Sequence, residues 1–482
     1  MLPSTFVMAD LQTITPEIFM CGAAFALLML DLFISPQRRG LIHFLSILVL
    51  VAAAILTARE MATEQIFAFS NMFVRDTASD VLKMAVYLVS AFSLIYARPY
   101  LIDRDLFKGE FYSLALFSVL GMMLMISAGS MVTLYLGLEL LALSSYGLVA
   151  MDRDNRLASE AAMKYFILGA LASGLLLYGM SMVYGATGSL QLAEIYSASG
   201  ISANQNMLLL GVVFMLVGIA FKFGAAPFHM WLPDVYQGAP TAVTLLIAAA
   251  PKLAAFGMFY RLLETGLGGT DVHWGDMVAY LAAISLVIGN LVALVQTNLK
   301  RLLAYSTISH VGFLFMGLVS ADNTGYSAAM FYAISYSLMT AAAFAAIITL
   351  SRKGHEAEEV SDFRGLWQHN PFHALMVLFV MASLAGVPPF LGFWAKLEVI
   401  KASVVSGYTW LAILSVVTAV VGAFYYLRII RAMFFEEPKN EAPRLHTDSH
   451  LRVVFTINAM GLLVMGIFAE PIMSWCRLAF PV

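Results

Sequence analysis

The 482-residue chain has little charge and almost no cysteine. Only 12% of its residues are Asp, Glu, Lys or Arg, and 61% are hydrophobic, which excludes the ordinary soluble globular class. Cys21 and Cys476 lie far apart with no Cys/His cluster, so neither a disulfide framework nor a metal or iron–sulfur site is indicated. The sequence also lacks a GxGxxG motif, a P-loop and a nucleophile elbow. The net charge of -3 says little about partners, and we expect no nucleic acid among them.

Long apolar segments fill most of the chain instead. A helix needs about 20 apolar residues to cross the hydrocarbon core of a bilayer. We therefore expect an all-α polytopic membrane protein with about fourteen membrane helices in the lipid bilayer. The predicted spans are 15–34, 41–57, 77–97, 111–128, 130–150, 160–184, 206–236, 240–263, 274–296, 300–319, 325–350, 371–402, 408–433 and 452–476.

Lys and Arg are unevenly distributed between the loops. Seventeen follow odd-numbered helices, whereas only five lie in the even-numbered loops and the tail. The positive-inside rule then predicts that both termini face away from the cytoplasm.

An internal repeat joins two parts of the chain. Three short matches recur in order at nearly constant offsets, so helices four to eight correspond to helices nine to thirteen. Because a shift of five helices is odd, the two units must cross the membrane in opposite senses, as inverted repeats do. We predict N-terminal helices in 1–110, repeats in 111–263 and 274–433, and a C-terminal loop and helix in 434–482. The matches are 147–149 with 317–319, 161–165 with 328–332, and 227–228 with 389–390.

Prolines interrupt one helix at matching positions of each repeat. Pro227 lies in the seventh segment, and Pro388 and Pro389 lie in the twelfth. Proline removes a helical hydrogen bond, so we expect both helices to be broken near mid-membrane, with carbonyl groups freed. Paired interrupted helices are the best sequence indication of a transport site.

Six hydrophobic segments each carry a titratable side chain. A charge at membrane depth costs roughly 2.5–3.5 kcal/mol on insertion scales, so such residues usually mark ion pathways. This pattern predicts a proton path. The six residues are Glu139, Lys164, Lys222, Lys252, His310 and Lys396.

Glu139 has no charged neighbour within a turn of its own helix, so its partner must come from another helix, and Lys222 is the first choice. The alternative to a switchable pair is a fixed ion pair that locks two helices together. Lys252 follows Pro251 and has no acidic neighbour, which favours a central proton carrier. Lys396, near Glu398, is either the exit carrier or a side chain that extends to the interface.

The other candidates are more ambiguous. Lys164 has Glu160 four residues earlier, so a local surface pair is as good an interpretation as a path role. His310 and His229 are either proton relays or ordinary packing residues. For Asp76, Asp80 and Lys83 at the start of the third helix, an ordinary helix end is preferred to a coupling cluster.

Three sequence stretches resemble the antiporter-like subunits of bacterial respiratory complex I, the proton-pumping NADH–quinone oxidoreductase. The stretches are Leu136 to Leu140, Phe221 to Pro240 and Gln296 to His310, and the likeness extends over essentially the whole chain. The resemblance implies that Glu139 and Lys222 form the coupling pair, that Lys252 is the central carrier, and that Lys396 leads to the exit.

The resemblance also implies where the redox chemistry resides. This chain would hold no cofactor and bind no NADH directly; FMN, iron–sulfur clusters and the quinone site would belong to partner subunits of the complex. Other membrane-arm subunits would be its neighbours, in a bacterial inner membrane. Multi-subunit cation/proton antiporters share the same core, so a subunit of such an antiporter is the alternative.

Overall fold

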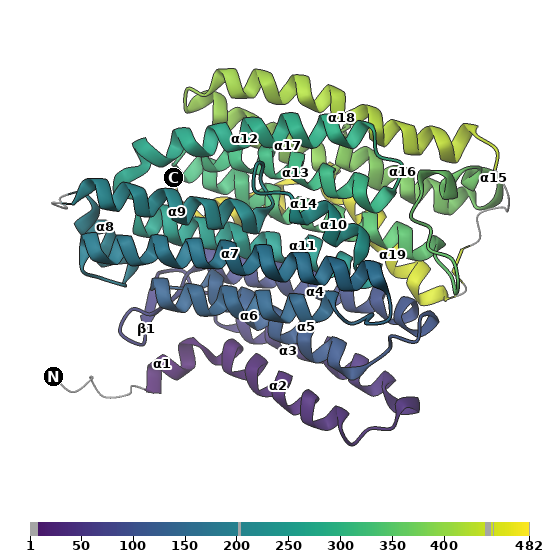
Figure 1. Cartoon of the computed structure of the whole chain (residues 1–482), viewed down its shortest axis with the longest axis horizontal. Helices are drawn as coiled ribbons and strands as arrows, with labels where there is room; N and C mark the ends of the chain where they lie inside the picture. The colour runs from purple at the N-terminus through teal and green to yellow at the C-terminus, as the bar shows by residue number, and fades with distance from the viewer. Residues whose placement is uncertain (1–7, 201–203, 439–444, 447, 482) are drawn as a thin grey trace.

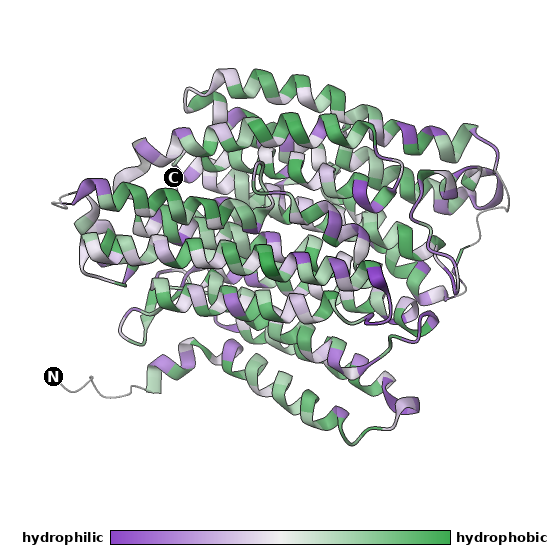
Figure 2. Ribbon diagram, in the orientation of Figure 1, coloured by the Kyte–Doolittle hydropathy of each residue, from purple (hydrophilic) through white to green (hydrophobic). Residues whose placement is uncertain are grey.

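The computed structural model describes residues 8–200, 204–438, 445–446 and 448–481. Long helices lie side by side and make up most of these residues (Figure 1). Apolar residues dominate along the helices, whereas many hydrophilic residues lie near their ends (Figure 2). The principal helices are α2 (Thr15–Asp31), α3 (Gly40–Arg59), α4 (Thr77–Asp103), α5 (Gly109–Ile126), α6 (Met131–Val149), α7 (Arg156–Thr187), α9 (Gln205–Phe223), α10 (Trp231–Gly238), α11 (Thr241–Phe259), α12 (Asp271–Leu294), α13 (Leu299–Leu318), α14 (Asn323–Leu350), α16 (Pro371–Ala385), α17 (Leu391–Val405), α18 (Thr409–Phe435), α19 (Ser449–Ile467) and α20 (Glu470–Ala479).

Eleven helices among the described residues are long and apolar enough to cross a membrane. This confirms the all-α polytopic class. The other three predicted spans correspond to α2, α13 and the pair α16–α17, so the total of fourteen stays a prediction. The boundaries of the predicted repeats stay predictions as well.

Two helices form the centre of the bundle. Every residue of α11 is buried, and so is the most apolar stretch of α14. In α3, at the edge of the bundle in Figure 1, only 28% of the corresponding stretch is buried. Lipid or partner subunits can therefore reach α3, whereas α11 and α14 contact only protein.

Both predicted helix breaks are confirmed. The seventh segment divides into α9 and α10, and the twelfth divides into α16 and α17. Gly224 and Gly386, with φ of 76° and 86°, end α9 and α16 in the left-handed conformation that glycine adopts without steric cost. The chain then passes through the prolines before the second half-helix begins.

The fourteenth predicted segment, 452–476, is wrong as a continuous helix. α19 ends at Ile467, and the short helix α20 begins at Glu470. Pro471 has no N–H to donate to the Ile467 carbonyl, so the helical ladder cannot continue through it. Part of the predicted C-terminal loop, residues 439–444 and 447, lies outside the described residues.

Several short elements were not predicted. β1 (Ile66–Ala68) and β2 (Phe73–Arg75) form an antiparallel hairpin between α3 and α4. A π-helical turn at Tyr260–Gly266 extends α11. The remaining short elements are α1 (Met8–Thr13), α8 (Leu192–Ser199), α15 (Leu366–His369) and 3-10 turns at Pro36–Arg38, Gly268–Thr270 and Val360–Phe363.

Candidate functional site

Lys252 contacts the first helix break. Its Nζ donates a hydrogen bond to the carbonyl oxygen of Phe223, the last residue of α9, at 2.6 Å. The last carbonyls of a helix have no partner within the helix and carry its partial negative charge, so they suit an ammonium group. The residue is only 2% exposed, and its Nζ lies 5.9 Å from the ring centre of Trp231. The freed carbonyl thus supplies the partner that no nearby acidic residue provides.

Lys396 contacts the second break in an equivalent manner. Its Nζ donates to the carbonyl oxygens of Leu384 and Ala385, at the end of α16, over 3.0 and 2.8 Å. Glu398 pairs with Lys401 at 2.8 Å instead. The ammonium is therefore held by the break and does not extend to the membrane interface.

Glu139 and Lys222 lie near each other without direct contact. The Glu139 carboxylate exerts an electrostatic attraction on Lys222, but the two form no ion pair among the described residues. Tyr135 interacts with the Glu139 carboxylate, and Glu139 Oε1 is buried with no hydrogen-bond partner among the residues that the structure describes. The fixed ion pair that the sequence left open as an alternative is thus not present in this conformation.

A small cavity adjoins Lys222. It has a volume of about 20 Å³ and lies between α6, α7, α9 and α10. A space of roughly 10–15 Å³ holds one water molecule. A water here would extend the reach of the ammonium toward neighbouring groups. Lys222 also acts electrostatically on Lys252, so the two cations lie within range of each other.

His310 lies in a chain of hydroxyl groups near the second break. Its Nδ1 is 2.7 Å from the Tyr332 hydroxyl, and its Nε2 is 3.1 Å from the Tyr426 hydroxyl. Tyr426 in turn contacts the Ser306 hydroxyl. Lys396 acts electrostatically on the imidazole. The imidazole and the three hydroxyl groups can each both donate and accept a hydrogen bond, which is the property a proton relay needs.

The tyrosines of this network were missed in the sequence. Each lies within an apolar helix, Tyr332 in α14 and Tyr426 in α18, and looks like a packing aromatic. A buried tyrosine hydroxyl usually needs a partner. This requirement indicates that a tyrosine within an apolar helix has a polar neighbour. It does not indicate which residue that neighbour is.

Lys164 and His229 take no part in these lysine contacts among the described residues. Lys164 pairs with Glu160 at 2.9 Å, as the local interpretation predicted, and also with Asp234 at 2.7 Å. Asp234 further pairs with Arg301 at 2.8 Å, so α7, α10 and α13 are joined by one ionic link. His229 lies in the first break, where its side chain interacts with the Pro227 backbone and its Nδ1 is buried with no hydrogen bond that meets the distance and angle criteria in the described part of the chain. The geometry leaves both its possible roles open.

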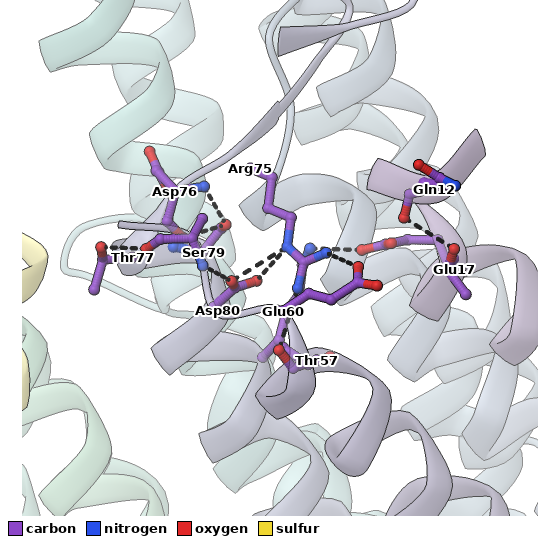
Figure 3. Close-up of polar contacts among 12 residues, drawn as sticks. Gln12, Glu17, Thr57, Glu60, Arg75, Asp76, Thr77, Ser79 and Asp80 are labelled. Atoms are coloured by element: carbon purple, nitrogen blue, oxygen red, sulfur yellow. Dashed lines mark hydrogen bonds and ion pairs between the residues drawn. The ribbon is translucent and has the colours of Figure 1, made fainter. Parts of the chain in front are cut away.

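A second group of buried charges lies at the start of α4 (Figure 3). Arg75 pairs with Asp80 at 3.2 Å and with Glu60 at 3.4 Å. Lys83 pairs with Glu17 of α2 at 2.6 Å, and both side chains are at most 5% exposed. Buried pairs of this kind fix the relative positions of helices, because separating them leaves an uncompensated charge.

Asp76 caps α4, as the helix-end interpretation predicted. Its side chain accepts the Ser79 amide, and it pairs with Arg261 of the π-helical turn at 2.8 Å. Burial raises the pKa of Asp76, but the charge of Arg261 and the hydrogen bonds from Ser79 outweigh that effect and hold it below its ordinary value. The start of α4, which is the third predicted helix, is thus also joined by an ion pair to the π-helical turn that extends α11.

The fold and the lysine contacts together define a polytopic membrane protein with paired broken helices, an architecture of ion transporters. The family described as "NADH:quinone oxidoreductase/Mrp antiporter, TM" matches residues 128–422. The chain belongs to this family. It is 56% identical to the NADH-quinone oxidoreductase subunit N of Xanthomonas euvesicatoria, over 98% of this chain and 97% of that protein. It is 52% identical to the subunit N of Thioalkalivibrio sulfidiphilus, over 98% of each.

Solved structures agree with this assignment. A chain of respiratory complex I from Thermus thermophilus is 32% identical, with a TM-score of 0.81, over 95% of this chain and 98% of that one. A chain of the Mrp complex from Dietzia sp. is 20% identical with a TM-score of 0.84, over 97% of each chain. At that identity the second likeness concerns the fold alone. The resemblance to antiporter-like subunits of complex I is confirmed.

Proposed function

We propose that the chain is the proton-translocating membrane subunit of an NADH–quinone oxidoreductase. NADH oxidation and quinone reduction take place in partner subunits that carry FMN, iron–sulfur clusters and the quinone site. The 56% identity to a protein named subunit N of that enzyme supports this assignment. The chain itself is a translocase component without a redox role, in a bacterial inner membrane with both termini on the periplasmic side.

The observation that carries the proposal is the position of two lysines at two helix breaks. Lys252 and Lys396 each bind carbonyl oxygens that a continuous helix would use internally. These carbonyls solvate an ammonium without a neutralising carboxylate. Since burial destabilises a charged lysine while helix-end carbonyls stabilise it, a modest rearrangement can load or release its proton.

The proposed path assigns a role to each titratable group. Glu139 and Lys222 form the coupling pair, which the cavity and electrostatic attraction support but which closes only on rearrangement. Lys252 is the central carrier, and Lys396 with His310 leads to the exit. Lys164 and His229 are auxiliary sites on the same route.

Lys222→Ala tests this proposal directly. The assembled complex, purified and reconstituted into liposomes, is expected to lose most NADH-driven proton pumping, and Glu139→Gln is expected to do the same. Lys401→Ala is the matched control, because Lys401 is more than half exposed and pairs with Glu398 at the protein surface. A Lys222→Ala complex that assembles fully and pumps normally would sink the proposal. A purely structural scaffold predicts the reverse pattern, with failed assembly and normal turnover of whatever assembles.

The alternative is a subunit of a multi-subunit cation/proton antiporter, which the fold alone also fits. Affinity purification of this chain from its native membrane separates the two. A large assembly with flavin, iron–sulfur subunits and NADH oxidation supports the oxidoreductase. A smaller set of membrane subunits without redox cofactors supports the antiporter.

A further inference from the structure

A groove of about 610 Å³ lies between the N-terminal ends of α16 and α19. Figure 1 places α15, α16 and α19 at the same end of the bundle. Among the residues that line the groove are His369, Phe372, Arg452, Val453 and Ile457. It lies apart from the lysine contacts at the helix breaks, and the proposed proton path does not use it.

The groove changes from polar to apolar along the direction of the membrane helices. Arg452 lies in the first turn of α19, which is long and apolar enough to span the bilayer. Val453 and Ile457 follow on the groove wall with 56% and 57% of their surface exposed, and Phe372 of α16 is 61% exposed. The Arg452 guanidinium therefore lies at the polar end of the groove, and exposed apolar side chains line the part of the groove that follows along α19.

Nearby carboxylates do not neutralise Arg452 in the described part of the chain. Asp448 accepts the His450 and Leu451 amides as the cap of α19. Glu436 pairs with Arg364 and Arg431. His369, an exposed residue on the same groove, offers a ring N–H that can donate a hydrogen bond to an anion. The polar end of the groove is therefore suited to an anion.

We propose that this groove is a binding site for one anionic phospholipid. The lipid phosphate lies against Arg452 and His369, and an acyl chain lies along Phe372, Val453 and Ile457. Basic pockets between membrane helices on the cytoplasmic side bind anionic headgroups, and the loop charges predict that this end of the bundle faces the cytoplasm. A free phosphate would satisfy the cation but would leave the apolar wall without a partner, which favours a lipid.

Photolabelling of the intact complex tests the site. The complex is placed in nanodiscs with a phosphatidylglycerol or a phosphatidylcholine that carries a diazirine on its acyl chain, and labelled peptides are mapped by mass spectrometry. We expect phosphatidylglycerol to label the segments around Phe372 and Ile457 about fivefold more than phosphatidylcholine does. Arg452→Gln should abolish that preference, and Arg452→Lys should retain most of it.

Lys353→Gln is the control variant, since it removes one charge from a loop on the same predicted side but outside the groove. It should label like the wild type. Equal labelling by both lipids, or an unchanged preference in Arg452→Gln, would overturn the proposal. So would a preference that millimolar inorganic phosphate removes, because the site would then be one for the free anion. Absence of lipid label at both segments, with crosslinks to a neighbouring subunit, would show a protein interface instead.

Discussion

The two helix breaks present their carbonyls to lysines in different ways. At the first break, Phe223 of α9 accepts a hydrogen bond from Lys252 of α11, a separate helix. At the second, Leu384 and Ala385 of α16 accept from Lys396, only twelve and eleven residues further along the same chain segment. The first contact therefore depends on the distance between two helices, whereas the second is set within one broken helix.

The packing around the two breaks differs as well. A small cavity adjoins Lys222 near the first break. At the second break, Trp394 Nε1 donates to the Gly466 carbonyl of α19 at 2.7 Å, and a Cβ on Gly466 would lie 2.1 Å from the Pro389 carbonyl. The second break is thus held against α19 by close packing, whereas a space for about one water molecule lies beside the first. Under the proposed function, we therefore expect the coupling movement to occur at the first break rather than at the second.

The largest expected effect is that of Lys252→Met. Methionine has a similar length but cannot carry a proton, so NADH-driven pumping should fall by about tenfold or more. Proton uptake into liposomes containing the assembled complex measures the effect. Lys401→Met, at an exposed position, should pump normally. Normal pumping by Lys252→Met would remove the first break from the path.

Gly466→Ala should disturb the second break through packing. The added Cβ would meet backbone atoms that cannot yield without movement of the break, at a cost of roughly 1–3 kcal/mol. Gly461→Ala on the same helix is the control, because its Cβ meets only the end of Met465 at 3.5 Å. Thermal unfolding of the purified complex should show a lower midpoint for Gly466→Ala alone. Equal midpoints would mean that α19 does not clamp the break.

Gly386→Ala separates backbone strain from the lysine contact. Gly386 and Gly407 both have φ of 86°, so alanine at either position should cost about 1–2 kcal/mol. Only at Gly386 would the Cβ approach Lys396, at 2.8 Å from its Cδ, whereas Gly407 faces open space. Pumping should therefore fall several-fold more in Gly386→Ala than in Gly407→Ala. A similar loss in both variants would attribute the effect to strain.

Trp394→Phe should give the smallest effect. Phenylalanine keeps an aromatic ring but lacks the indole N–H that donates to the Gly466 carbonyl. Loss of this hydrogen bond should lower the free energy of unfolding by about 1 kcal/mol. Thermal unfolding should show a slightly lower midpoint, and pumping should be nearly normal. Trp410→Phe is the control, since Trp410 is 46% exposed at the bundle surface. Severe loss of pumping in Trp394→Phe would indicate that the second break also moves during turnover.

Much of the fold could be predicted from the sequence. Runs of apolar residues indicate membrane helices because lipid forces each spanning segment to satisfy its own backbone groups. Pro227, Pro388 and Pro389 indicated both breaks for an equally local reason, the missing N–H. The predicted continuous helix 452–476 fails for the same reason, because Pro471 has no N–H and α19 ends at Ile467. The hairpin between α3 and α4 depends on a few backbone pairings that carry little sequence signal.

The candidate site could be predicted only in part. Lys252 and Lys396 were predicted to be proton carriers because lysine is costly in lipid. The structure places the ammonium groups of both at helix breaks, and the carrier role stays a prediction. Their acceptors are main-chain carbonyls, which every residue possesses, so no side-chain pattern could identify them. Glu139 and Lys222 were predicted to form a coupling pair, whereas in this conformation they interact electrostatically without an ion pair among the described residues, so the pair stays a prediction.

The sequence by itself determined that the protein spans a membrane, where two of its helices break, and that Lys222, Lys252 and Lys396 lie within its membrane segments. These properties follow from local chemistry: apolar length, missing amide protons and the cost of charge in lipid. Only the tertiary structure decided that Lys252 reaches across to α9 while Lys396 binds its own broken helix, and that His310 joins two distant tyrosines. Those contacts depend on how the helices pack, which is set by many weak interactions along their whole length rather than by any single residue.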